Sequence, residues 1–417
     1  MRLVERLAPP KLLVDPAWER AVLGPFVAKA RRALQRQLAT GEVEIDPGPT
    51  LERAYRSVPF YQRRFAERAL GLHDLQDPRA LGYLPITRRS DVAEHFTDFL
   101  VHPLEPFALG RGWLGRTSGS TGVPISYLRD PRTHAWFWAF VDFALGYVGR
   151  RPTRRPIVLL DSLAHLPQYE AELPLFHGAR FYKRASAAPD LEDELRRLRP
   201  QVITGDPESL AVLGGMSIGA PLVLSSAFAM PLATRHALEA TGAALLEYYA
   251  TQETSVIGVS CRHGHGFHAL SGACLFEAID GELVLTPTHN PSFILIRYAP
   301  GDHGTVVDDG RCPCGLSGPR IASLEGRTHV RFAAANGTFP AASVGPLLAR
   351  LPVVEHQLVQ HAADRYTLRV RGIEHLSTGV LKARLAELAG MPVRLDVVRV
   401  ESIPRSGSKP EPFRVEP

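Results

Sequence analysis

A short segment rich in hydroxyls and glycines, from Arg116 to Pro124, has the residue types best suited to binding phosphate. Glycines let backbone N–H groups approach a phosphate closely, and hydroxyls add further donors. The segment has no lysine, so it is not the lysine-containing phosphate loop, and a catalytic cation must come from elsewhere. We interpret it as a loop for the β- and γ-phosphates of ATP; the alternative is an ordinary turn, since these residues are common in turns. Its candidate ligands are Thr117, Ser118, Gly119, Ser120, Thr121 and Gly122.

Two later segments offer groups for the rest of a nucleotide. Tyr249 follows a predicted strand, where a tyrosine can lie against a flat base, and Glu253 could bind a hard cation such as Mg²⁺. Asp302 follows a Pro-Gly pair and could accept hydrogen bonds from both ribose hydroxyls. Taken alone, each has a plainer interpretation: a buried tyrosine, an exposed glutamate and a turn aspartate.

Near the C-terminal end, Lys409 lies in a Ser-Gly-Ser-Lys segment. Attack of a carboxylate on an α-phosphate brings two anions together, and the growing charge must be neutralised. An ammonium group delivered by a closing domain would do this. The alternative is a solvated lysine in a tail.

The pattern of apolar runs predicts the elements that must position these residues. From Pro156 to about Leu285, short apolar runs alternate with helical segments, which favours an α/β layered domain with mostly parallel sheets. The expected strands are 157–160, 201–204, 222–224 and 245–248, and the expected helices are 191–199, 208–213 and 233–240. Segments 282–286 and 293–297 are predicted to form a later antiparallel pair, and residues 11–110 a helical entry region.

The pattern of predicted strands and helices changes after Gly326. Strands are expected at 355–360, 366–370 and 393–400, with a helix at 376–388. The sequence therefore predicts a large N-terminal domain, residues 1–326, and a small mobile α+β C-terminal domain, residues 327–417, which carries Lys409.

Composition excludes several classes of protein. The 417 residues are 45% hydrophobic and 22% charged, as in a soluble globular protein. We find no apolar run long enough to span a membrane and no signal peptide, so we expect a cytoplasmic protein. The net charge of +5 is spread along the chain without a basic stripe interleaved with aromatics, which argues against nucleic-acid binding.

The order of these motifs resembles that of adenylate-forming enzymes, and specifically their phenylacetate–CoA ligase-like branch. The similarity spans roughly residues 50 to 410. It rests on the hydroxyl and glycine loop and on Val58-Pro59-Phe60-Tyr61, Leu84-Pro85-Ile86-Thr87, Cys312-Pro313-Cys314-Gly315, Pro319-Arg320-Ile321 and Glu325-Gly326-Arg327.

The resemblance implies a role for each matching residue. Glu253 would bind Mg²⁺, and Lys409 would assist adenylation before the C-terminal domain rotates to admit a thiol. The nucleotide would be held by Ser118, Ser120 and Thr121 at the pyrophosphate end, by Tyr249 at the adenine, and by Asp302 and Arg327 at the ribose.

The chain also departs from the family pattern. Ala250 and Gln252 replace a glycine and a hydroxyl residue in the Tyr-Gly-x-Ser/Thr-Glu segment, and Phe228 stands where an acid is expected. The hinge reads Gly-Arg-Thr-His instead of Gly-Arg-x-Asp, which bears on the domain rotation and therefore on thiol transfer.

Cysteines and histidines suggest a structural zinc site. Cys312 and Cys314 form a tight knuckle, and a segment beginning at Cys261 adds one thiol and three imidazoles. Three cysteines and a histidine are a common closed tetrahedral set for Zn²⁺, and the alternative is free buried thiols. By resemblance to zinc-bearing family members, the ligands would be Cys261, His268, Cys312 and Cys314, with His265 and Cys274 in reserve.

We therefore expect ATP-dependent activation of a small carboxylic acid, aryl or arylacetic, followed by transfer to CoA. Trp136 or Phe140 could line a pocket for an aromatic acid, although core packing of their helix is the plainer interpretation. Transfer to an amine or a carrier-protein thiol is an alternative acceptor chemistry. A non-catalytic nucleotide-binding homologue is the alternative from another class. A homodimer would fit the resemblance.

Overall fold

The computed structural model describes residues 16–77, 80–104, 112–117, 124–161, 168–219, 221–326, 330–348, 351–372, 376–406 and 409–416. The predicted phosphate ligands Ser118, Gly119, Ser120, Thr121 and Gly122 lie outside these residues, as do Arg327 and the rest of the predicted hinge.

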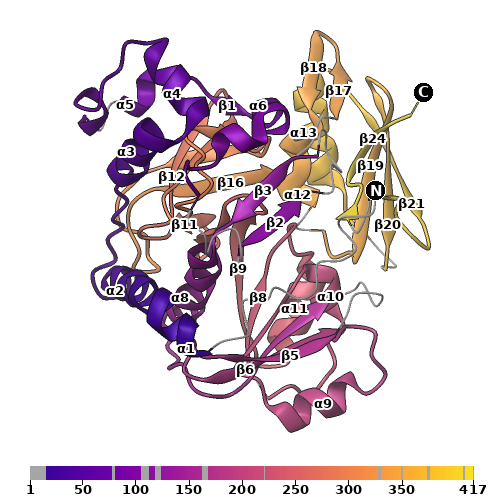
Figure 1. Ribbon diagram of the computed structural model, residues 1–417. Helices are drawn as coiled ribbons and strands as arrows, with labels where there is room; N and C mark the ends of the chain where they lie inside the picture. The colour runs from indigo at the N-terminus through magenta and orange to yellow at the C-terminus, as the bar shows by residue number, and fades with distance from the viewer. Residues whose placement is uncertain are drawn as a thin grey trace.

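One continuous 14-stranded sheet organises the larger part of the chain (Figure 1). A run of parallel strands forms its lower part: β6 (Ala179–Ala185), β4 (Ile157–Asp161), β7 (Val202–Gly205), β8 (Leu222–Ser225) and β9 (Ala244–Thr251). Strand β5 (Tyr169–Leu173) adds an antiparallel edge to β6. The predicted α/β class is confirmed, and four expected strands correspond to β4, β7, β8 and β9.

Helices cover both faces of this parallel run. Because successive side chains of a strand point to opposite faces, Ile157 packs with one group of helices and Val158 with the other. The first group is α2 (Gly24–Thr40) and α8 (Pro131–Tyr147), preceded by α1 (Pro16–Trp18) and η2 (Glu19–Leu23). The second is α9 (Leu191–Leu198), α10 (Pro207–Ala211) and α11 (Leu232–Ala240).

Helix α8 is the buried helix of this domain. Asp130 caps its N-terminus by accepting a hydrogen bond from the Arg132 backbone N–H at 2.8 Å. Trp136 and Phe140, considered above for an acyl pocket, are buried in the core, and the Trp136 indole N–H donates to the Val256 carbonyl at 3.0 Å.

The upper part of the sheet is largely antiparallel. From β9 it continues through β10 (Ser255–Ser260), β11 (Phe267–Ala269), β16 (Arg320–Gly326), β15 (His303–Val307), β13 (Glu282–Pro287), β14 (Tyr298–Ala299) and β1 (Thr87–Arg88), which pairs in parallel with β14. Strand β12 (Cys274–Ile279) pairs with β13 off this path.

The predicted strand at 293–297 is wrong. The run is buried, but only Phe293 makes an isolated bridge, and it is β14, which begins at Tyr298, that pairs with β13 in place of this run. Other segments satisfy its backbone instead: the Ile296 N–H donates to the Tyr61 hydroxyl at 2.6 Å, and the Ile294 N–H to the Phe99 carbonyl at 3.1 Å. Periodicity alone cannot distinguish such a buried irregular run from a strand.

Helices from the entry region bury this run in a second core. They are α3 (Gly48–Ser57), α4 (Pro59–Ala66), η3 (Asp74–Gln76), α5 (Ala80–Tyr83), α6 (Arg89–His95) and η4 (Phe96–Phe99). Beside them, β2 (Trp113–Arg116) and β3 (Ser126–Arg129) form a hairpin that frames the hydroxyl and glycine loop.

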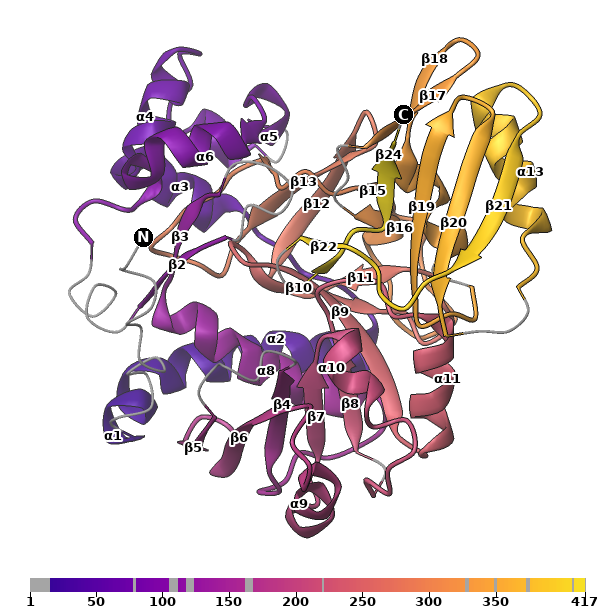
Figure 2. The ribbon, with the colours of Figure 1, turned by 90° about the vertical axis from the view of Figure 1, so that its right-hand side faces the viewer.

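A separate small domain with its own core forms the C-terminal part (Figure 2). Its four-stranded sheet runs β21 (Arg394–Arg399), β20 (Arg365–Arg371), β19 (Glu355–Ala362) and β24 (Phe413–Val415). The remaining elements are hairpins β17 (Arg331–Ala334)–β18 (Gly337–Pro340) and β22 (Arg405–Ser406)–β23 (Lys409–Pro410), with η5 (Ala341–Val344), α12 (Gly345–Leu348) and α13 (Gly379–Ala389). The exact boundary proposed after residue 326 falls beside residues outside the described ranges.

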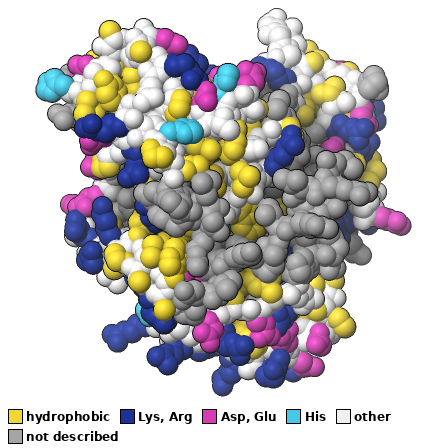
Figure 3. Space-filling view, in the orientation of Figure 1, with side chains coloured by type: hydrophobic (Ala, Val, Ile, Leu, Met, Phe, Trp, Pro, Cys, Tyr) yellow, Lys and Arg dark blue, Asp and Glu magenta, His cyan; other side chains and the backbone are white. Residues whose placement is uncertain are grey.

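Among the described residues, no helix is long and apolar enough to cross a membrane. Basic and acidic side chains are interspersed along the lower edge of the face in Figure 3. There, α9 carries ion pairs from Arg196 to both Glu192 and Asp193.

A buried glutamine fixes helix α2 to the sheet and gives a test of this packing. The side chain of Gln37 is fully buried, donates to the Ala269 carbonyl at 2.8 Å and accepts from the Ser271 N–H at 2.9 Å. Replacing Gln37 with Leu removes the side-chain partner of the Ala269 carbonyl and of the Ser271 N–H. We therefore expect the free energy of unfolding to fall by about 1–3 kcal/mol in denaturant titrations. The matched control is Gln35→Leu at an exposed position of the same helix. Equal effects of the two substitutions would contradict this role.

Candidate functional site

The predicted adenine and ribose residues contact each other. Tyr249 lies in β9, and Asp302 lies in the turn between β14 and β15. The Tyr249 hydroxyl donates to Oδ2 of Asp302 at 2.7 Å, and both side chains are buried. The antiparallel half of the sheet thus brings together two residues that are 53 positions apart.

Glu253, the predicted magnesium ligand, lies in the turn between β9 and β10. Its side chain has no exposed surface, and Oε1 accepts hydrogen bonds from Arg89 Nη1 at 2.8 Å and from the Tyr298 hydroxyl at 3.1 Å. A buried carboxylate needs such partners because losing its hydration is costly. Glu253 is therefore held in one position by a cation and a hydroxyl.

Arg89 also reaches the hydroxyl and glycine loop. Its Nη2 donates to Thr117 Oγ1 at 3.1 Å. Thr117 closes the base of the loop, since its N–H donates to the Ile125 carbonyl at 2.9 Å and its hydroxyl accepts from the Ile125 N–H at 3.0 Å. One guanidinium thus connects the loop base to the buried carboxylate.

Local structure explains why these groups meet. The turn after β9 is held by Thr251 and Thr254, each of whose hydroxyls accepts the other's backbone N–H at 3.2–3.3 Å. Pairing of β1 with β14 sets Thr87 opposite Tyr298, which brings Arg89, at the start of α6, beside the Tyr298 hydroxyl.

Two residues of this network have no role in the sequence analysis: Arg89 and Tyr298. The signal for Arg89 is its place two residues after the Leu-Pro-Ile-Thr segment, and that for Tyr298 is its place at the head of the segment that ends in Asp302. Neither signal identifies the partner, since both contacts join segments more than 40 residues apart.

For the predicted catalytic lysine, Lys409, the structure describes the backbone. Lys409 lies in β23, opposite Ser406 of β22, so this lysine belongs to a short hairpin. The lysine comes from the small C-terminal domain, whereas the Glu253 network belongs to the large one.

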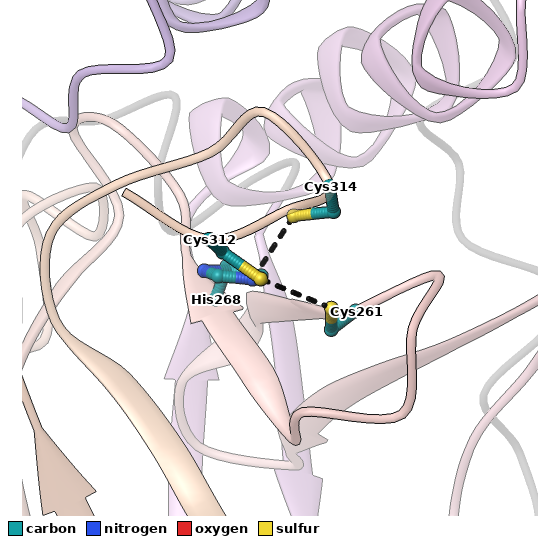
Figure 4. A group of neighbouring side chains, drawn as sticks. All are labelled: Cys261, His268, Cys312 and Cys314. Atoms are coloured by element: carbon teal, nitrogen blue, oxygen red, sulfur yellow. Dashed lines mark hydrogen bonds between the residues drawn. The ribbon is translucent and has the colours of Figure 1, made fainter. Parts of the chain in front are cut away.

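A second cluster contains all four predicted zinc ligands: Cys261, His268, Cys312 and Cys314 (Figure 4). One donor atom from each lies within 4.8 Å of the others, and all four residues are buried. Cys261 Sγ lies 3.4 Å from Cys312 Sγ, and Cys314 Sγ lies 3.3 Å from His268 Nε2. Two hairpins supply them, because Cys261 and His268 flank the β10–β11 turn and the two other cysteines lie between β15 and β16.

The donor set fits a divalent metal ion. Burial raises the pKa of the Cys312 thiol to about 12, which disfavours the thiolate unless a cation is beside it. Burial, with Arg320 and His265 nearby, lowers the pKa of His268 to about 4, which leaves a neutral imidazole as a metal requires. Of the reserve ligands, His265 Nδ1 lies 3.3 Å from Cys312 Sγ, whereas Cys274 lies in β12 and bonds the Leu275 carbonyl.

The cysteine cluster lies where several elements end. Ser317, just after the knuckle, donates through its N–H and its hydroxyl to the Gly41 carbonyl at the end of α2, at 2.7 and 2.9 Å. Arg262 donates to the Cys314 carbonyl at 3.1 Å and lies over the Tyr147 ring of α8. A metal here would join two hairpins and two helix ends.

Comparisons with known proteins identify the fold of this chain. No family model and no curated protein matches the sequence. The chain is similar to the solved structure of 2-hydroxyisobutyryl-CoA ligase in the postadenylation state with R3-HIB-AMP, with a TM-score of 0.65 and 17% identity over 98% of this chain and 92% of that chain. The complex of that ligase with 2-HIB-AMP gives 0.63 at 17% identity over the same shares, and its open conformation with 2-HIB-AMP and CoA gives 0.57 at 16% identity over 97% and 93%. The chain therefore has the fold of these CoA ligases.

Metal analysis tests the cysteine cluster directly. We expect the purified protein to contain about one zinc ion per chain, since a closed set of four ligands holds one ion. Replacing Cys312 with Ser should remove most of it and lower the melting temperature, while Cys274→Ser should retain the metal. Mass spectrometry of metal content gives the readout; equal zinc in both variants, or none in the wild type, would contradict the assignment.

Proposed function

We propose that this protein is an ATP-dependent acid-activating enzyme that forms an acyl-adenylate, releases pyrophosphate and passes the acyl group to CoA. The observation that carries the proposal is the connection from Thr117 through Arg89 to the buried carboxylate of Glu253. It joins the base of the hydroxyl and glycine loop to the one carboxylate expected to serve the phosphates. The shared fold with a CoA ligase supports the same activity.

In this proposal the nucleotide lies along the upper edge of the sheet. Loop residues 118–122 would hold its phosphates, Tyr249 would contact the adenine, and Asp302 with Arg327 would bind the ribose. The hydrogen bond from Tyr249 to Asp302 orients the carboxylate for ribose hydroxyls and fixes the tyrosine ring beside it.

Charge at the phosphates would be balanced from two sides. Glu253 is the carboxylate that would hold Mg²⁺, and a bound ion would offset the negative charge of the phosphates. Arg89 already supplies a cation at this position, between Glu253 and the loop base. Lys409 would be brought in by the small domain to neutralise charge at the α-phosphate.

The acid is proposed to be small, and the aryl or arylacetic class is the first to test. The comparison ligase is named for 2-hydroxyisobutyrate, a short branched hydroxy acid, which makes that class the second. CoA is the proposed acceptor, with an amine or a carrier-protein thiol as alternatives. Zinc in the cysteine cluster would be structural, since four protein ligands leave no open position for chemistry.

One observation favours a non-catalytic nucleotide-binding protein as the second candidate. Arg89 is an ion-pair partner of the very carboxylate that would bind magnesium. If this pair persisted with nucleotide bound, the protein could hold ATP without the metal that adenylation needs. Magnesium dependence of the two processes distinguishes the candidates.

Pyrophosphate release tests the lead proposal. We would measure release from ATP against aryl, arylacetic and short hydroxy acids, with and without CoA, and identify acyl-CoA by mass. Lys409→Ala should lower adenylation by about 100-fold or more, with ATP affinity nearly unchanged. Lys382→Ala, on helix α13 of the same domain, is the matched control. Binding of ATP without acid-dependent release from any acid would favour the second candidate.

Arg89 gives a prediction that depends on charge. Because its guanidinium serves both Glu253 and Thr117, Arg89→Ala should raise the KM for ATP by about 10-fold or more, as expected for loss of charged hydrogen bonds. Arg89→Lys should recover part of the loss. The neighbouring Arg88→Ala removes an exposed pair with Glu282 and should change the KM little. Equal KM values for the Arg88 and Arg89 variants would refute this role.

A further inference from the structure

A tyrosine crosses the hairpin that frames the hydroxyl and glycine loop. Gly115 of β2 lies opposite Tyr127 of β3, and a Cβ on Gly115 would overlap the Tyr127 ring. The glycine is therefore required for the tyrosine to lie across β2. The buried ring ends in a hydroxyl that donates to Gln252 Oε1 at 3.0 Å.

Arg129, two residues after Tyr127 in β3, binds the same glutamine. Its Nε donates to the Gln252 carbonyl at 2.8 Å, and its Nη2 lies 3.4 Å from both Gln252 Oε1 and the Thr251 carbonyl. The guanidinium also lies 5.5 Å from the centre of the Tyr127 ring, within range of a cation–π contact. The glutamine is exposed, yet its side chain and its backbone are both held.

Gln252 and Glu253 are adjacent, and they bind the two strands of the hairpin separately. Gln252 holds β3 through Tyr127 and Arg129, while Glu253 holds the end of β2 through Arg89 and Thr117. The rigid turn that carries both residues therefore fixes both sides of the loop base.

We propose that Tyr127, Arg129 and Gln252 form a clamp of positioning residues that holds the hairpin of β2 and β3, on either side of the proposed phosphate-binding residues, in place for the nucleotide. The proposal rests on the proposed function for the meaning of the loop. It also gives a physical role to Gln252, which stands where the family pattern has a serine or threonine. The amide oxygen of this glutamine accepts from the Tyr127 hydroxyl at 3.0 Å and lies 3.4 Å from Arg129 Nη2.

The clamp predicts a specific kinetic signature. A hairpin held in place in advance spares the nucleotide the entropy cost of fixing it, so loosening the clamp should weaken ATP binding without slowing the reaction of the bound complex. We expect Tyr127→Phe and Gln252→Ala each to weaken ATP binding by about 3- to 10-fold in calorimetry, the effect of one lost hydrogen bond. The kcat should stay within about twofold of the wild-type value.

Two comparisons separate this role from a general loss of structure. Tyr127→Phe combined with Gln252→Ala should weaken binding no more than Gln252→Ala alone, because that substitution already removes the hydrogen bond with Tyr127 together with the contact to Arg129. Tyr182→Phe, on β6 and far along the sheet from the hairpin, is the matched control and should bind ATP as the wild type does.

Amide hydrogen exchange tests the clamp independently of catalysis. Amides of residues 113–117 and 125–129 should exchange faster in both clamp variants than in Tyr182→Phe. Unchanged exchange, additive losses in the double variant, or a fall in kcat with ATP affinity intact would overturn the proposal. If the wild type binds no nucleotide, the proposed function fails, and the exchange measurement alone then decides whether the clamp exists.

Discussion

A buried carboxylate constrains the centre of this protein. Glu253 has lost its contact with water, and a carboxylate in that state must be neutralised and hydrogen-bonded. Its partners come from three distant segments: Arg89 at the start of α6, Tyr298 in β14 and, through Arg89, Thr117 at the loop base. The entry helices, the antiparallel half of the sheet and the hairpin are thus set around one charge.

Strand β10 links this charge to the cysteine cluster. Glu253 lies two residues before the strand and Cys261 just after it, so Thr254 and the six residues of β10 separate the two sites, and the strand accounts for about 20 Å of extended chain. The polar network fixes one end of the β9–β10–β11 ribbon, and the four-ligand cluster gathers the other end against α2 and α8. Neither end relies on apolar packing alone, which suits a ribbon that carries Tyr249, the partner of Asp302.

The hairpin of β2 and β3 depends on the same turn. Gln252 and Glu253 are consecutive and lie in a turn whose two threonines bond each other's backbone. Tyr127 and Arg129 of β3 bind that turn directly, and Thr117, just after β2, is connected to it through Arg89. Gly115 leaves the room that Tyr127 needs.

The sequence by itself determined the α/β class, strands β4, β7, β8 and β9 with the helices between β6 and β9, and the small C-terminal domain, because these follow from local periodicity; it did not predict β5 and β6. Residue chemistry suggested a cysteine and histidine metal site, and the family resemblance selected His268 among its three histidines. Periodicity failed at 293–297, where a buried run bonds to Tyr61 and Phe99 and forms no strand. Only the tertiary structure decided that Arg89 and Tyr298 hold Glu253, that Tyr249 bonds Asp302, and that Gln252 meets Tyr127. The physical reason is that each of these contacts joins residues far apart in the chain, and their partners are chosen by the register and crossing of strands, which local sequence does not encode.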